Sequence, residues 1–145
     1  MSIFLDTGVL VAFANPEDAN DRAGVDIMRG VADRRWGDTY TSDYVLDEAV
    51  TVTRRRTRRP ERAIHVGRLI LGSAEMGWTM GLLFVSPRVF LKSWALFARL
   101  SSRGLSFTDC TSICLVREPR LDAIASFDSG FDGLVARVAG TQGPA

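Results

Sequence analysis

The sequence predicts an α/β fold, a three-layer α/β/α sandwich with a central, mainly parallel sheet, formed as a single domain by residues 1–140. Short apolar segments alternate along the chain with longer segments of helical periodicity, which is typical of parallel sheets. The first segment, Ile3–Leu5, is continuously apolar, as expected of a strand covered by helices on both faces. The 145 residues are 46% hydrophobic and 24% charged, which matches an ordinary globular domain.

The first strand is predicted to end at Asp6, and Gly8 then allows a sharp turn. Ligands of parallel sheets bind outside the carboxyl ends of the strands. Asp6 is therefore a candidate ligand residue. The alternative is that Asp6 only caps the short helix that begins near Val9 and breaks at Asn15–Pro16.

A second helix is expected from about Asp18 to Arg35, followed by a second strand over Trp36–Thr41. Ser42 is a suitable N-cap for a third helix. On that helix Glu48 shares the apolar stripe that should face the core, whereas Asp47 points elsewhere. A buried ionised glutamate is costly, so a metal ion, an arginine or a position at the water-exposed edge of the stripe must compensate it.

The third helix ends in a cluster of arginines. Only one of the 18 basic residues of the chain, Lys92, is a lysine, and the arginine fork suits phosphate. We expect the cluster to contact a nucleic-acid backbone, although a docking patch for an acidic partner and a solvated turn are alternatives. Its members are Arg54, Arg55, Arg56, Arg58 and Arg59, with Arg62 close by.

The middle of the chain predicts a fourth helix over Pro60–Met76, a third strand over Trp78–Val85 and a fifth helix from Ser86–Pro87 to Gly104. The fifth helix has a wide apolar face. Aromatic side chains at helical spacing belong more often to a core or a subunit contact than to a base-stacking platform. The residues of this face are Val89, Phe90, Trp94 and Phe97.

The last part of the chain contains two more candidate acids, one at the start of a predicted helix and one directly after a predicted strand. Ser106 and Asp109 have the spacing of a capping box at the start of a sixth helix, so Asp109 is either a capping group only or a site residue. A buried strand is expected over Leu121–Phe127, with Asp128 directly after it. Residues 134–138 are expected to form an edge strand, and residues 141–145 a flexible tail.

The four candidate acids can meet at one edge of the sheet. Two of them follow strands, one begins a helix, and one points inward from a helix. Carboxylates crowded there would repel one another and raise their pKa values. Mg²⁺ or Mn²⁺ would relieve the repulsion, because these cations prefer oxygen ligands. Such a site suits phosphoryl chemistry with an activated water. The acids are Asp6, Glu48, Asp109 and Asp128, and the hydroxyls expected to support them are those of Thr7 and Ser126.

The acidic segments resemble the four motifs of PIN-domain nucleases, and in length and order are closest to the VapC-type toxins of toxin–antitoxin pairs. The resemblance spans Ile3 to about Asp132. The segments that carry it are Asp6-Thr7, Asp47-Glu48, Leu105-Ser106-Phe107-Thr108-Asp109 and Ala125-Ser126-Phe127-Asp128.

This resemblance implies a Mg²⁺- or Mn²⁺-dependent endoribonuclease that forms a homodimer and is inhibited by a small antitoxin inserting a C-terminal segment into the active-site groove. By position, Asp6, Glu48, Asp109 and Asp128 would be the catalytic, metal-binding acids, with Thr7 and Ser126 supporting them. Some members of the family have a further acid shortly after the fourth motif. In this chain Asp132 is the acid nearest to that position. It is expected either to support the site or only to cap a loop.

Three other functions share parts of this pattern. A housekeeping RNA-processing PIN nuclease would have the same metal site. A non-catalytic PIN-like binding module would use the acids as caps. A phosphatase of the haloacid-dehalogenase type also begins with Asp after a first strand, but requires a second Asp where this chain has Gly8.

No membrane segment or secretory signal is predicted. The longest apolar stretch, Met80–Val85, is far below the ~20 residues that span a bilayer, and no basic region precedes the N-terminal apolar run. We therefore expect a cytoplasmic protein. Cys110 and Cys114 are expected to be buried thiols rather than a disulfide or half of a zinc site, and His65 to be a structural or surface residue.

Overall fold

The structure, a computed structural model, describes residues 1–140 and contains a five-stranded sheet in the order β3-β2-β1-β4-β5. Every neighbouring pair of strands is parallel, which confirms the predicted α/β class. The predicted flexible tail, residues 141–145, lies outside the described residues. The strands are β1 (Ser2–Leu5), β2 (Asp38–Ser42), β3 (Met80–Leu83), β4 (Ala123–Ala125) and β5 (Arg137–Val138).

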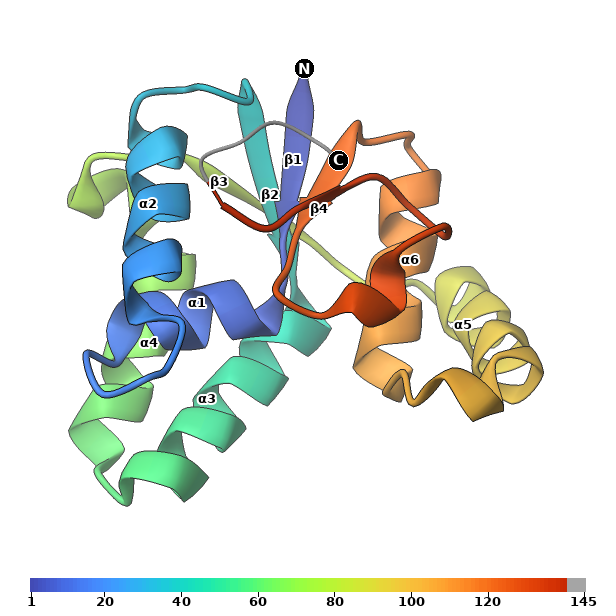
Figure 1. Cartoon of the computed structure of the whole chain (residues 1–145), viewed down its shortest axis with the longest axis horizontal. Coiled ribbons are helices and arrows are strands. Elements are labelled where there is room, and N and C mark those ends of the chain that lie inside the picture. The colour runs from blue at the N-terminus through green and yellow to red at the C-terminus, as the bar shows by residue number, and fades with distance from the viewer. Residues whose placement is uncertain (141–145) are drawn as a thin grey trace.

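Helices cover both faces of the sheet, as the predicted three layers require. Figure 1 shows α1 to α4 on one side of the strands and α5 and α6 on the other. In the described part of the chain no helix has the length and hydrophobicity needed to cross a bilayer. The helices are α1 (Thr7–Ala14), α2 (Asp21–Ala32), α3 (Asp43–Thr57), α4 (Pro60–Leu71), α5 (Pro87–Arg99) and α6 (Phe107–Arg117), with short 3-10 turns η1 (Ser73–Met76), η2 (Ser101–Arg103) and η3 (Ser129–Phe131).

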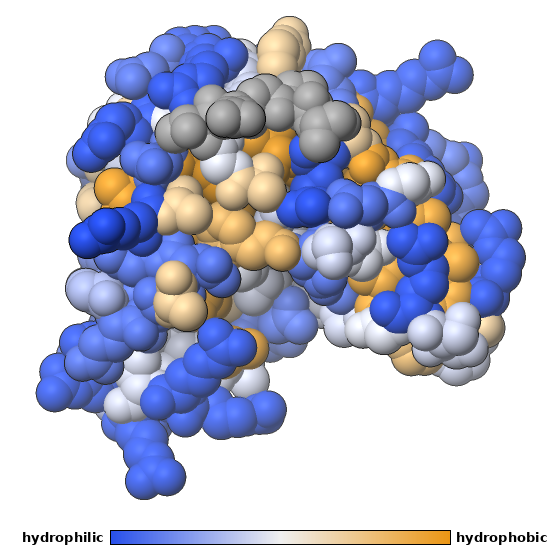
Figure 2. Space-filling model, in the orientation of Figure 1, coloured by the Kyte–Doolittle hydropathy of each residue, from blue (hydrophilic) through white to orange (hydrophobic). Residues whose placement is uncertain are grey.

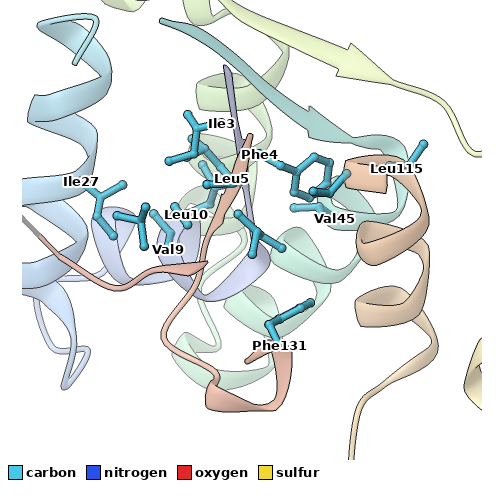
Figure 3. Close-up of a cluster of buried hydrophobic side chains, with 14 of the residues drawn as sticks. Ile3, Phe4, Leu5, Val9, Leu10, Ile27, Val45, Leu115 and Phe131 are labelled. Carbon is cyan, nitrogen blue, oxygen red and sulfur yellow. The ribbon is translucent and has the colours of Figure 1, made fainter. Parts of the chain in front are cut away.

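The central strand β1 is the middle of the hydrophobic core. Its residues Ile3, Phe4 and Leu5 are each 0% exposed. Successive side chains of a strand point to opposite faces. Phe4 accordingly points towards Leu115 of α6, and Ile3 towards the side of Ile27 on α2 (Figure 3). The continuous apolar run in the sequence reflects this burial on both faces.

The second strand begins at Asp38, two residues later than predicted. Gly37 has a φ of +70°, which takes the backbone out of the extended region just before the strand. Trp36 is instead buried against α2, where a Cβ added to Gly30 would lie 2.5 Å from its ring. The weak alternation that predicted a strand at Trp36 thus includes one residue that packs on a helix.

Other elements are shorter than predicted, mainly at their ends. Helix α2 occupies residues 21–32 instead of 18–35, and Arg34 adopts a left-handed φ of 53° just beyond it. The last turns predicted for α4 and α5 are the 3-10 turns η1 and η2, and Gly104 with φ +75° ends the latter. Strands β3, β4 and β5 occupy only the centres or ends of the segments predicted for them.

The apolar face of α5 is only partly a core face. Val89 is buried, but Phe90 and Trp94 are 44% and 58% exposed, so the core interpretation is wrong for these two rings. Figure 2 shows apolar colour reaching the surface on the side of α5 and α6. We name the exposed group the α5 aromatic face; it consists of Phe90, Leu91 and Trp94, with Trp94 four and three residues after the other two on this helix.

Candidate metal centre

The pairing of β1 with β4 brings the first and fourth acidic segments together. Leu5 lies opposite Ala125 in the parallel register, so the next residues, Asp6 and Ser126, emerge side by side at the carboxyl edge of the sheet. The Asp6 N–H donates to the Ala125 carbonyl at 3.1 Å. The Ser126 hydroxyl donates to Asp6 Oδ2 at 2.7 Å. Residues 120 positions apart thus form one buried pair.

Asp6 is not a side-chain cap of the helix that follows it. It occupies the N-cap position of α1, but its carboxylate accepts no capping hydrogen bond. The residue is 5% exposed, and within residues 1–140 its buried Oδ1 has no hydrogen-bond partner. Burial raises the pKa of Asp6 to about 7, and the negative charges of Asp109 and Glu48 add to this, although the Ser126 hydroxyl lowers it.

Glu48 reaches the same edge from α3. Ser42 caps this helix as predicted, accepting a hydrogen bond from the Val45 N–H at 3.1 Å. The Thr7 hydroxyl donates to Glu48 Oε2 at 2.6 Å, and within residues 1–140 no arginine forms an ion pair with Glu48. Its half-buried carboxylate therefore faces the other acids, while the neighbouring Asp47 is exposed elsewhere.

Asp109 forms the predicted capping box and also faces the site. The Ser106 N–H donates to Asp109 Oδ2 at 2.8 Å, and the Asp109 N–H donates to the Ser106 hydroxyl at 3.0 Å. Burial raises the pKa of Asp109, and the nearby carboxylates of Glu48 and Asp128 raise it further. Capping and membership of the acidic group are therefore compatible in this residue.

Asp128 is the most exposed of the four acids. Its Oδ1 accepts a hydrogen bond from the Gly130 N–H at 2.7 Å, which caps the turn η3. Its own N–H donates to the Ser126 hydroxyl at 3.1 Å. Ser126 therefore links the backbone of Asp128 to the carboxylate of Asp6.

The four acids line a single cleft of about 650 Å³ at the carboxyl edge of the sheet. The far wall of this cleft is the turn between α1 and α2, for which the sequence predicts only a helix break. That turn contributes Asn15, Glu17, Asp18 and Asn20. A loop without periodicity carries no sequence signal for such a position.

The donor set of this cleft fits a hard divalent cation. It offers carboxylate oxygens, including the unpartnered Oδ1 of Asp6. Within residues 1–140, however, no three His, Cys, Asp or Glu side chains already have the close arrangement of a metal-binding group. A bound cation would thus keep several waters as ligands or draw the carboxylates together, and the former is usual for Mg²⁺.

The residues that would suit zinc lie apart from the cleft. His65 is exposed on α4, and both cysteines are free, with Cys110 buried and Cys114 half-buried in α6. Burial raises the pKa of the Cys110 thiol to about 11, so this thiol is protonated and unsuited to bind a metal at neutral pH.

Asp132 is not among the residues that line the cleft. Its carboxylate accepts hydrogen bonds from Arg137 Nε at 2.6 Å and from Nη2 at 3.0 Å. Arg137 also donates to the Ser126 carbonyl at 3.1 Å. Asp132 therefore holds an arginine that braces β4, which is a structural role not visible in the sequence.

The arginine cluster divides between two surfaces. Arg56 lines the acidic cleft, and its Nη1 lies 3.7 Å from Asp18 Oδ2. Arg54 and Arg55 instead border a separate apolar notch between α3 and α4. Hydrophilic colour covers the projecting end of this helix pair in Figure 2. Arg58, with a left-handed φ of 58°, ends α3.

Comparison with known proteins finds similarity in both sequence and fold. A family model described as PIN domain matches residues 3–136. A protein named VapC ribonuclease from Archaeoglobus fulgidus is 26% identical over 132 residues, which cover 90% of this chain and 80% of that relative. The crystal structure of Mycobacterium tuberculosis VapC20, described as a sarcin-ricin loop cleaving toxin, superposes with a TM-score of 0.71 at 24% identity, covering 87% of this chain and 89% of that one.

Proposed function

The chain belongs to the PIN-domain family, and on this premise we propose that it is a divalent-metal-dependent endoribonuclease and the toxin of a type II toxin–antitoxin pair. The observation that carries the proposal is the gathering of four carboxylates from four separate elements around one cleft. A metal-dependent nuclease requires such a group of hard oxygen ligands next to a space that admits a phosphodiester. The relative named VapC ribonuclease supports the same activity.

Each acid has a defined neighbour that orients it. Ser126 holds Asp6, and Thr7 holds Glu48. The Ser106 amide holds one oxygen of Asp109, and the Gly130 amide holds Oδ1 of Asp128. Asp6, Glu48, Asp109 and Asp128 would together hold the cation, for which Mg²⁺ or Mn²⁺ is the best match to the donors. When bound, the cation supplies Lewis acidity that activates water and offsets charge on the phosphate.

The test is cleavage of a labelled single-stranded RNA by the purified chain with Mg²⁺ or Mn²⁺ and with EDTA. Asp6→Asn and Glu48→Gln should each slow cleavage by at least about 100-fold, because each removes a charged ligand. Asp47→Asn is the matched control for Glu48→Gln, since it changes the adjacent but exposed acid. An Asp6→Asn protein as fast as the wild type would reject the proposal.

Titration with Mn²⁺ distinguishes a catalytic site from a non-catalytic PIN-like module. A nuclease should bind Mn²⁺ with an affinity that falls in Asp109→Asn. A binding module that uses its acids only as caps should bind no Mn²⁺ in the cleft and cleave no RNA.

We further propose that the protein is cytoplasmic, acts as a homodimer and is inhibited by a small antitoxin. The α5 aromatic face supports a homodimer, because exposed apolar patches of this kind mark protein contacts. Co-purification with the small protein encoded next to this chain would support a toxin. Absence of such a partner would favour a housekeeping RNA-processing nuclease with the same metal site.

A further inference from the structure

We propose that Arg56 binds an RNA phosphate at the far end of the cleft, and that Asp18 holds Arg56 in place until the substrate displaces it. This inference rests on the proposed nuclease function and specifies how the substrate is positioned. It separates Arg56 from the other arginines of the cluster, which the sequence does not distinguish from one another.

The position of Arg56 on α3 is the first argument. Glu48, Val52 and Arg56 follow one another at intervals of four residues, so they lie on one face of the helix, and all three line the cleft. Eight residues of helix span about 12 Å. Arg56 therefore lies about two turns along α3 from Glu48, which places it for a phosphate neighbouring the one at the acids.

The charge of the cleft is the second argument. Within residues 1–140 Arg56 is the single basic residue that lines it, among acids at both ends. A bound cation would offset the acids at the strand edge, but the α1–α2 turn presents Glu17 and Asp18 to the path of a polyanion. An RNA strand passing this turn needs a positive partner there, and the guanidinium fork suits phosphate.

The contact between Asp18 and Arg56 is asymmetric. The Asp18 side chain is 13% exposed, and its Oδ1 accepts a hydrogen bond from the Asn20 N–H at 2.8 Å. The Arg56 side chain is 63% exposed and meets Asp18 at 3.7 Å. At this distance, and with its guanidinium largely in solvent, Arg56 is held only weakly. Arg56 can therefore leave Asp18 for a phosphate while Asp18 stays in the turn.

Arg62 provides a contrast within the same helix pair. Its Nη1 donates to Asn15 Oδ1 at 2.9 Å, and the residue is half-buried. Arg62 therefore fastens α4 to the α1–α2 turn and is not available to a substrate. Arg54 and Arg55 are exposed, but they border the apolar notch instead of the cleft.

The test measures binding of a fluorescein-labelled single-stranded RNA by anisotropy, with Ca²⁺ in place of Mg²⁺ and recovery of intact RNA verified on a gel. Arg56→Gln should raise the Kd about 10-fold and reduce the slope of log Kd against log salt by about 0.7, the value for one phosphate contact on a single strand. Arg68→Gln, the control at an exposed arginine of α4 that belongs neither to the cluster nor to the lining of the cleft, should change the Kd less than about twofold. Equal effects of the two substitutions would overturn the proposal.

Asp18→Asn tests the second part of the proposal, that Asp18 holds Arg56 in place. It keeps the oxygen that accepts from Asn20 but removes the charge, and should lower the Kd about threefold because Arg56 is no longer held. The gain must disappear when Arg56→Gln is also present. The same gain in both backgrounds would mean that Asp18 only repels RNA, and would reject its role in holding Arg56.

Two controls keep these results interpretable. Thermal unfolding of each variant shows whether the turn is intact, and Arg56→Lys, which keeps the charge, should restore part of the binding and of the salt slope. Because binding is measured without cleavage, a wild-type protein that binds RNA through Arg56 but cuts none would reject the nuclease proposal alone. A wild-type protein that binds no RNA would reject this inference.

Discussion

The Ser126 hydroxyl donates a hydrogen bond to Asp6 Oδ2 at 2.7 Å and simultaneously accepts one from the Asp128 N–H at 3.1 Å. This buried hydroxyl joins the first and last acids of the cleft. It leaves Asp6 Oδ1 free of any partner within residues 1–140. Ser126 therefore fixes which oxygen of Asp6 has a hydroxyl partner and which one lacks a partner.

Removing this hydroxyl should weaken cation binding. Ser126→Ala is expected to lower the Mn²⁺ affinity by about 10- to 100-fold, because neighbours that orient a ligand typically contribute this much. The pKa of Asp6 should also rise further, since the Ser126 hydrogen bond lowers it. Calorimetric titration with Mn²⁺ measures the change.

Ser93→Ala is the matched control for that measurement. Ser93 is equally buried, at 0% exposed, and its hydroxyl donates within α5 to the Val89 carbonyl at 2.7 Å. It should lose a similar hydrogen bond without altering Mn²⁺ affinity. Equal losses in the two variants would indicate a general loss of stability and contradict the role assigned to Ser126.

The carboxylate of Asp6 should make the metal-free protein less stable as the pH rises. Its pKa is about 7 in the folded protein and 3.8 ordinarily, so the folded state binds the proton more tightly than the unfolded chain. This group therefore lowers the free energy of unfolding progressively between about pH 4 and pH 7, by at most about 4 kcal/mol.

Asp6→Asn removes the ionisable carboxylate and with it this loss of stability. In EDTA, urea denaturation should find the variant more stable than the wild type at pH 8, with a difference that shrinks at pH 5, where wild-type Asp6 is protonated. Asp47→Asn, at an exposed position, should show no such pH-dependent difference. A stability difference for Asp6→Asn that is the same at both pH values would contradict the raised pKa.

Two helical glycines should respond in opposite ways to the same substitution. In Gly24→Ala the new Cβ would lie 2.9 Å from the Phe13 backbone nitrogen and 3.1 Å from the Ala12 Cβ, so α1 and α2 must separate. We expect a loss of about 1–3 kcal/mol in the free energy of unfolding. Urea denaturation at equilibrium measures it.

Gly67→Ala, in α4, is the companion variant. Its Cβ would meet the Val50 Cγ2 at an ordinary 3.6 Å. Alanine should therefore stabilise the protein by about 0.5–1 kcal/mol through its higher helix propensity. Destabilisation by Gly67→Ala, or none by Gly24→Ala, would contradict the helix packing described above.

The α5 aromatic face should control the oligomeric state. Trp94→Glu places a charge on this face and should convert the proposed homodimer into a monomer, because burying an unpaired charge is costly. Light scattering after gel filtration gives the mass. Leu71→Glu changes a similarly exposed apolar residue at the end of α4 and should leave the dimer intact; a wild-type monomer would reject the dimer itself.

Local sequence patterns were sufficient for the class of fold and for the caps. Continuous apolar runs predicted the parallel sheet, because a strand buried on both faces has no polar side. Ser42 and the Ser106–Asp109 pair were correctly predicted as caps, since capping depends on residues only three apart. Element ends were less predictable, as at Trp36, because packing on α2 outweighs a weak alternation.

The sequence by itself determined that this protein is a parallel α/β fold and which acids follow its strands or begin its helices, because each of these properties depends on neighbours within a few residues. Only the tertiary structure decided which side chains orient those acids and which arginine side chains lie near acidic ones. The Asp6–Ser126 bond depends on the β1–β4 register, and Arg56 faces the cleft because the α1–α2 turn lies across from it. Asp132 binds Arg137 for the same reason: side chains of similar local pattern are distinguished only by what the fold places opposite them.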